Sequence, residues 1–120
     1  MKQTLLAMIA ILSSASFAAA DGDATAGEKV FRKCAACHSV DGSKKKPGPH
    51  LAGILGRPAA SVEGFKYSQS LSEAGLVWDT ETLTAFLANP RENVPGTKMS
   101  FPGIRKEDDL TNLIAYLEGL

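Results

Sequence analysis

The pentapeptide Cys34-Ala35-Ala36-Cys37-His38 constrains this chain more than any other part of its sequence. Two thiols three positions apart, at the end of a predicted helix, can add to the two vinyl groups of one haem, and the adjacent histidine can then reach the iron. This spacing is typical of a c-type haem attachment site. We therefore expect much of the remaining chain to form a haem pocket.

Three other kinds of site could contain this motif, and each requires residues or elements that can be looked for in the sequence. A thioredoxin-like redox pair requires a preceding strand in a βαβ context, whereas the segment before Cys34 has helical spacing. A zinc site requires four ligands, and the Cys and His residues of the chain are only Cys34, Cys37, His38 and His50, two of them adjacent. A short-loop disulfide leaves the features described below unexplained. Haem attachment fits the residues best.

The first twenty residues, Met1 to Ala20, are typical of a cleaved signal peptide. Lys2 supplies the charged start, residues 5–12 the apolar core, and three alanines at 18–20 the cleavage site. A retained membrane anchor is the alternative, but the apolar run is barely long enough to span a bilayer and serines interrupt it. Haem is attached to c-type proteins outside the cytoplasmic membrane, so the signal and the motif agree. We predict export to the periplasm.

The remaining residues, 21–120, are enough for a single domain with a thin protein core. A buried porphyrin would add apolar volume to that core. The whole chain carries 13 Lys and Arg against 13 Asp and Glu residues, and this balance lacks the basic excess of a nucleic-acid-binding protein. Basic residues gather on both sides of the pentapeptide and acidic residues near the C-terminus. Such a distribution is either a solvated face or a docking surface.

Apolar spacing and capping residues predict an all-α fold of helices and long loops around the cofactor. Asp23 and Asp79 are predicted to cap two of the helices, and Gly75 and Pro90 to end two. No persistent strand pattern is present. The predicted helices span residues 24–36, 67–74, 80–89 and 106–118.

Gly27 lies inside the first predicted helix, where it lowers helix stability unless another backbone must come close. The last predicted helix offers an apolar face for such an approach. We therefore predict that the N- and C-terminal helices cross, with Gly27 and Phe31 against Leu113 and Tyr116.

A second iron ligand is needed on the side opposite His38. Met99 and His50 are the remaining candidates in residues 21–120. A lone methionine is more often a core filler, but Met99 ends the loop Pro95-Gly96-Thr97-Lys98-Met99, which can bring its side chain over a flat ligand. A neutral thioether stabilises ferrous iron, so histidine and methionine together suit an electron carrier.

Further motifs in the same order make the chain resemble a known family. They are CAACH, GPHLAGILGR from Gly48, GFKYS from Gly64, Trp78, the Asn89-Pro90 pair and PGTKMSFPGI from Pro95. Together they resemble the class I c-type cytochromes, and most closely the mitochondrial cytochromes c and the related soluble cytochromes of proteobacteria. The resemblance implies one covalent haem c, His38 and Met99 as axial ligands, a mostly helical fold, and the transfer of single electrons between larger proteins.

The resemblance also implies roles for residues around the haem. Pro49 matches a proline whose carbonyl accepts the proton on the far ring nitrogen of His38, which orients the ring and raises its basicity. Arg57, Tyr67 and Trp78 match groups around the haem propionates, where a cation and polar aromatic tips offset the burial of carboxylates.

On the other axial side, Thr97 matches a hydroxyl near Met99, and Phe101 matches an aromatic residue beside the exposed haem edge. The chain departs from many relatives at two positions there. Phe86 stands where a tyrosine is common and Leu71 where an asparagine is common. Both changes remove polar groups, so we expect a reduction potential at least as high as in relatives that carry them.

The sequence thus predicts a soluble, monomeric, periplasmic carrier of single electrons that is not an enzyme. Its expected partners are redox proteins that it contacts transiently: a membrane oxidoreductase complex, an oxidase, a reaction centre or a periplasmic dehydrogenase. The expected docking cations are Lys33, Lys46, Lys98 and Lys106. The alternatives are a peroxidase-like or gas-binding haem protein in which Met99 is labile, and a subunit bound permanently to a periplasmic dehydrogenase.

Overall fold

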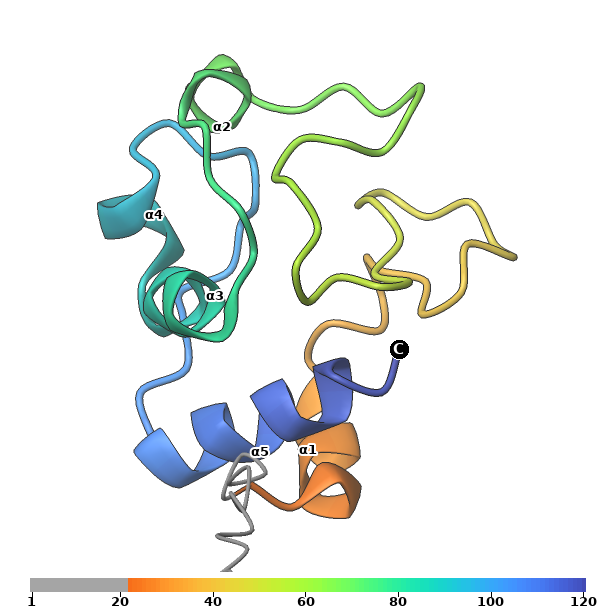
Figure 1. The fold of residues 1–120 in the computed structure, drawn as a ribbon, viewed down its shortest axis with the longest axis vertical. Helices are drawn as coiled ribbons and strands as arrows, with labels where there is room; N and C mark the ends of the chain where they lie inside the picture. The colour runs from red at the N-terminus through yellow and green to blue at the C-terminus, as the bar shows by residue number, and fades with distance from the viewer. Residues whose placement is uncertain (1–21) are drawn as a thin grey trace, which may run out of the picture.

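The computed structural model describes residues 22–120, which form five helices joined by long loops (Figure 1). The helices are α1 (Ala24–Phe31), α2 (Gln69–Glu73), α3 (Thr80–Ala88), α4 (Pro90–Asn93) and α5 (Glu107–Leu117). Strand-like pairing within these residues is limited to an isolated bridge between Pro58 and Val77. The predicted all-α fold is therefore confirmed.

The predicted signal peptide, Met1 to Ala20, lies outside the described residues. The predicted boundary between that segment and the domain lies outside them as well. In the part of the chain that the structure describes, none of the helices has the length and apolar character needed to cross a membrane.

Asp23 begins α1 as expected, because its carboxylate accepts hydrogen bonds from two amides of the first turn. The helix ends at Phe31, earlier than the predicted end at residue 36. Over residues 32–34 the amides bond to carbonyls three positions back instead of four, including a 2.7 Å bond from Cys34 to Phe31. Such bonds wind the chain more tightly than an α-helix. The cysteines therefore lie on a turn that follows α1.

The two terminal helices α1 and α5 cross and pack against each other at one end of the molecule (Figure 1). A Cβ atom on Gly27 would overlap the backbone oxygen of Asn112 and lie 2.9 Å from the Cβ of Tyr116. The rings of Phe31 and Tyr116 are in contact, with centroids 5.2 Å apart. The predicted crossing is confirmed, but the atoms nearest Gly27 belong to Asn112 and Tyr116, while Leu113 is buried in the core.

The last helix, α5, is one residue shorter at each end than predicted. Its first turn is acidic, as the helix dipole favours. The side chains with the predicted helical spacing are all buried: Leu110, Leu113, Ile114 and Leu117.

The middle of the chain holds three short helices. α3 begins after Asp79, whose side chain accepts a 2.7 Å bond from the Thr82 amide, and it ends one residue before the predicted end. α2 is shorter than the predicted helix over 67–74 because Ser68 caps it, accepting a bond from the Leu71 amide. α4 was not predicted. Asn89 caps α4 with Pro90 in its first turn, a common helix start that the sequence analysis treated only as a stop.

Residues 32–68 contain no helix and lie across from α3 and α4, while α1 and α5 close one end (Figure 1). The core joins these parts: it includes Ile54 from the long loop, Trp78, Phe86 from α3, and Ile104 from the segment before α5. This arrangement leaves a cavity between the long loop and the α3 side, and the candidate site lies there.

Candidate functional site

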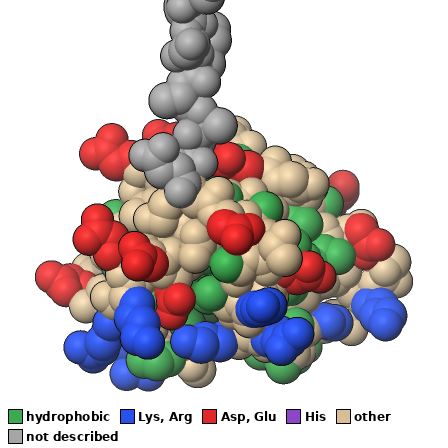
Figure 2. Space-filling view, turned by 90° about the horizontal axis from the view of Figure 1, so that it is seen from below, with side chains coloured by type: hydrophobic (Ala, Val, Ile, Leu, Met, Phe, Trp, Pro, Cys, Tyr) green, Lys and Arg blue, Asp and Glu red, His purple; other side chains and the backbone are tan. Residues whose placement is uncertain are grey.

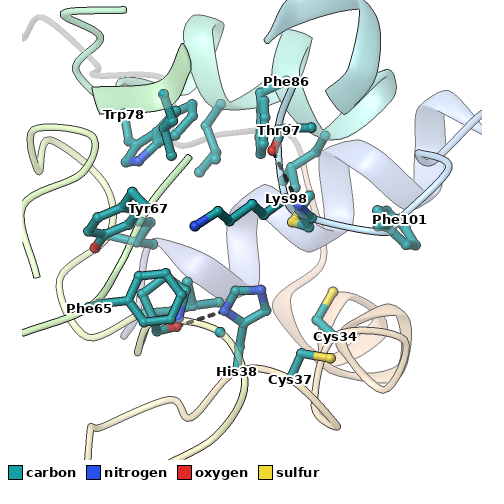
Figure 3. Close-up of a pocket in the computed structure, with 18 of the residues that line it drawn as sticks. Cys34, Cys37, His38, Phe65, Tyr67, Trp78, Phe86, Thr97, Lys98 and Phe101 are labelled. Atoms are coloured by element: carbon teal, nitrogen blue, oxygen red, sulfur yellow. Dashed lines mark hydrogen bonds between the residues drawn. The ribbon is translucent and has the colours of Figure 1, made fainter. Parts of the chain in front are cut away.

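A cavity of about 650 Å³ opens within the fold, and its lining is mostly apolar (Figure 3). In the view of Figure 3, His38 and the cysteines lie below the cavity, while Trp78, Phe86 and Thr97 lie above it. Every residue that the sequence analysis assigned to the site lines this cavity: Cys34, Cys37, His38, Pro49, Arg57, Tyr67, Trp78, Thr97, Met99 and Phe101.

Cys34 and Cys37 lie on the turn after α1 and do not form a disulfide with each other. Cys34 is half-buried and Cys37 is exposed. Burial raises the pKa of the Cys34 thiol, and the nearby charge of Lys33 only partly opposes this. The turn holds His38 close to both thiols, because the His38 amide donates a 3.0 Å bond to the Cys34 carbonyl.

His38 is oriented through one ring nitrogen. Its Nδ1 lies 2.7 Å from the carbonyl oxygen of Pro49. A carbonyl oxygen can only accept, so Nδ1 carries the hydrogen and donates it, which leaves Nε2 as the nitrogen able to bind a metal. Burial lowers the pKa of His38, and the charges of Arg57 and Lys46 add to this against the opposing bond to Pro49. The lowered pKa favours the neutral ring, which is the form that binds metals.

Gly48 packs directly against the His38 ring, a contact that the sequence analysis missed. A Cβ on Gly48 would lie 2.7 Å from Cε1 of His38 and 2.8 Å from the Cys37 carbonyl oxygen. Its amide also donates a 2.7 Å bond to that oxygen. The available signal was a glycine directly before Pro49, since a missing side chain permits close approach.

Arg57 brings a half-buried cation to the cavity wall. Its guanidinium donates to the carbonyls of Ala52 (3.1 Å) and His50 (3.0 Å), while its buried Nε has no hydrogen-bond partner among the described residues. Burial lowers the pKa of Arg57, opposed by Tyr67. An unpaired buried N–H is costly, and a carboxylate is a strong acceptor for an arginine donor. This group therefore fits a ligand that brings carboxylates.

Tyr67 and Trp78 line the same cavity. The Tyr67 hydroxyl accepts a 3.0 Å bond from the Val62 amide, and its ring packs edge-on against Phe65. Trp78 is buried against Phe86, with centroids 4.9 Å apart. Backbone bonds tie Trp78 to both Gly56 and Arg57. Each aromatic side chain is thus supported by a neighbouring aromatic ring.

Met99 is half-buried and lines the cavity, whereas the other candidate ligand, His50, is not among the lining residues. The Met99 amide donates a 3.3 Å bond to the Thr97 hydroxyl. Leu71 and Phe86 contribute apolar side chains to the same cavity. A sulfur donor and an imidazole donor thus share one mostly apolar space, and this donor set suits haem iron.

The cavity wall also includes residues to which the sequence analysis gave no role, among them Phe65 and Lys66. Both belong to the quoted segment GFKYS, but nothing in that segment alone distinguishes a wall residue from an exposed loop residue. The residues present fit a haem in three respects: paired thiols beside a histidine, a sulfur donor, and a half-buried arginine whose buried Nε–H has no partner among the described residues.

Comparison with known proteins gives concordant matches. The family model described as Cytochrome c matches residues 24–120. Cytochrome c-554 of Methylosinus trichosporium is 48% identical over 95% of this chain and 87% of that protein. Cytochrome c2 of Rhodoblastus acidophilus is 48% identical over 80% of this chain and 91% of that protein. The solved structure of cytochrome cH from Methylobacterium extorquens is 44% identical, with a TM-score of 0.78 over 82% of this chain and 100% of that one.

Proposed function

This chain belongs to the class I c-type cytochromes and is a haem c electron carrier, and we propose that it works as a soluble periplasmic protein with His38 and Met99 as axial ligands. Family membership means that its one cysteine pair, Cys34 and Cys37, attaches the haem covalently. When bound, the haem supplies an iron that takes up and releases one electron.

The observation that carries the proposal is that His38 and Met99 line one cavity together with both cysteines. Pro49 fixes the His38 ring so that Nε2 is the free nitrogen, and a hydrogen bond of this kind raises the basicity of the ligand. The Met99 thioether is a neutral, soft donor that favours ferrous iron. Two filled axial positions suit electron transfer better than the binding of a substrate or a gas.

The other cavity residues have supporting roles in this proposal. The Nε–H of Arg57, which has no partner among the described residues, would hold a haem carboxylate, and Tyr67 and Trp78 complete that part of the wall. Thr97 holds the backbone of Met99 through its hydroxyl. Phe101, half-buried at the cavity, would lie against the edge of the haem.

The ligand assignment is tested by the substitution Met99→Ala in the haem-loaded protein. Ferric haem with a methionine ligand absorbs in the near-red region, and we expect that band in the unaltered protein and its loss in Met99→Ala. Leu71→Ala is the matched control, since it removes an apolar side chain from the same cavity but no sulfur. Absence of the band from the unaltered protein would favour a peroxidase-like or gas-binding protein with an open iron position, and a band that survives in Met99→Ala would mean that Met99 is not its source.

Location and assembly need separate measurements. We propose that Met1 to Ala20 is cleaved, so the mass of the periplasmic protein should correspond to a chain that begins at Asp21 plus one haem. Retention in the membrane fraction at full length would contradict cleavage. We expect purification as a free monomer, and stable co-purification with a dehydrogenase would indicate a bound subunit instead.

The partners proposed for this carrier are a membrane oxidoreductase complex, an oxidase, a reaction centre or a periplasmic dehydrogenase. A pull-down with the haem-loaded protein from periplasm and membranes would identify the donor and the acceptor.

A further inference from the structure

Three consecutive lysines follow the haem-attachment turn, and the structure places the third differently from the other two. Lys44 and Lys45 are exposed, whereas Lys46 is half-buried. The Nζ of Lys46 donates a 2.5 Å hydrogen bond to the carbonyl oxygen of Ala35. Long lysine side chains usually keep their amine in water, so a short bond to the backbone distinguishes Lys46 from its neighbours.

The acceptor of this bond lies between the two cysteines. Ala35 is on the turn that follows α1, where the helical hydrogen-bond pattern has ended. Within residues 22–120, no backbone amide donates to the Ala35 carbonyl, and Lys46 supplies its donor. A bond from a charged donor is stronger than one between neutral groups.

The segment that contains Lys46 makes two further bonds to the same turn. The Gly48 amide donates to the Cys37 carbonyl at 2.7 Å, and the Pro49 carbonyl accepts from Nδ1 of His38 at 2.7 Å. Residues 46–49 therefore hold the turn at Ala35, Cys37 and His38. Of these three bonds, the one from Lys46 is the one whose acceptor lies between the two cysteines.

We propose that Lys46 is a positioning residue. It holds the backbone between Cys34 and Cys37 in place and thereby keeps the His38 ring hydrogen-bonded to the Pro49 carbonyl. One of the three N–H donors of the Lys46 amine is used by Ala35. This inference rests on the proposed ligand role of His38.

A second consequence concerns charge. The Lys46 amine lies beside the haem-attachment turn, because it is bonded to the Ala35 carbonyl between the two cysteines. A half-buried cation is screened less by water and salt than an exposed one. A positive charge near the iron disfavours the ferric state, so removal of the Lys46 charge should favour that state more than removal of the Lys44 or Lys45 charge.

The test compares three haem-loaded variants that each lose one positive charge: Lys46→Met, Lys44→Met and Lys45→Met. Amide hydrogen exchange at Gly48 and His38 reports local opening of the turn, and the Ile104 amide, bonded to the Leu87 carbonyl, reports a distant site. We expect exchange at Gly48 and His38 to become about tenfold faster or more in Lys46→Met alone. A merely structural loss of stability would accelerate exchange at Ile104 as well.

The ferric-to-ferrous ratio at a fixed potential is the second measurement. We expect it to rise about threefold in Lys46→Met, equivalent to about 28 mV for one electron, and to change less in the other two variants. Lys46→Arg keeps both the charge and the donors, so it should restore the exchange rates and the ratio.

The proposal is overturned if Lys46→Met matches Lys44→Met and Lys45→Met in both measurements. If Lys46→Met does not yield a folded protein, Lys46→Ala also removes both the charge and the donor and carries the same expectations. If His38 and Met99 are not the iron ligands, the near-red band will be absent from the unaltered protein. That result is separate from the comparison of the lysine variants, so failure of the ligand assignment and failure of the Lys46 proposal can be distinguished.

Discussion

Phe86 and Leu71 place apolar side chains on the cavity wall that Met99 shares. Phe86 is 7% exposed and packs against Trp78. The substitution Phe86→Tyr brings a hydroxyl to this wall, and a polar group there stabilises the charged ferric state. We expect the reduction potential to fall by about 30 mV, a threefold shift in the ferric-to-ferrous ratio, measured by redox titration.

Phe86→Leu is the control, since it changes packing without adding a polar group. An unchanged or higher potential in Phe86→Tyr would contradict the assigned effect of the apolar wall. A fall of the same size in Phe86→Leu would assign the effect to packing instead of polarity.

At the residue scale, the sequence located the cavity residues well but not the residues that support them. Cys34, Cys37 and His38 could be found because their spacing along the chain encodes the chemistry. The contact of Lys46 could not, because it depends on how a loop folds back over a turn. Lys44, Lys45 and Lys46 are adjacent residues of the same type. Only the path of the backbone makes Lys46 half-buried while the other two are exposed.

At the scale of elements, the crossing of α1 and α5 depends on Gly27. Glycine to alanine inside a helix normally stabilises by about 1 kcal/mol. Here the added Cβ would overlap the Asn112 backbone oxygen, so we expect Gly27→Ala to lower the free energy of unfolding by about 2 kcal/mol. Denaturant unfolding of the haem-loaded protein measures this change.

The neighbouring position offers a control for helix propensity. Glu28 is an exposed α1 residue, and Glu28→Ala should change stability by less than about 0.5 kcal/mol. A stabilised Gly27→Ala protein would mean that the two backbones can move apart at little cost, and the close contact would then not be needed for the crossing.

Element boundaries were predictable where a side chain marks them and uncertain elsewhere. α3 was predicted to within one residue because Asp79 marks its start and a proline follows its end. α1 was predicted too long because its apolar spacing continues to Ala36, although the hydrogen bonds tighten after Phe31. Periodicity alone does not distinguish a helix from the turn that extends it.

At the scale of the whole molecule, charge is distributed unevenly. Figure 2 shows lysine and arginine side chains along one edge of the face in view, with acidic side chains over much of the rest of it. Three lysines line the cavity: Lys33, Lys66 and Lys98. Of the four cations expected to dock a partner, Lys33 and Lys98 are therefore the two at the cavity, while Lys106 stands at the start of α5.

This asymmetry predicts electrostatic steering toward an acidic redox partner. We expect the second-order rate constant of electron transfer to fall about tenfold as ionic strength rises from low values to about 0.5 M, because salt screens exposed charges. Stopped-flow kinetics with the partner captured by pull-down measures this. Lys98→Met should weaken the salt dependence more than Lys44→Met, and a rate independent of salt would rule out steering.

The class of the molecule was predictable because its motifs occur in one order along the chain, from the cysteine pair to Met99. The positions of the charged side chains on the surface were harder to predict from the sequence. Basic residues near the pentapeptide in sequence diverge in space: Lys33 reaches the cavity, and Lys46 turns toward Ala35. Position in the sequence does not determine which side chains share a surface when long loops carry them.

The crossing of α1 with α5 also affects the order in which parts of the molecule can fold. The helices that meet at Gly27 and Asn112 are the first and last of the described chain, so their contact closes a loop of about 85 residues, at an entropic cost on the order of 4 kcal/mol. Until α5 has formed, α1 lacks its packing partner, and the cysteine turn that follows α1 is attached to a helix without tertiary support.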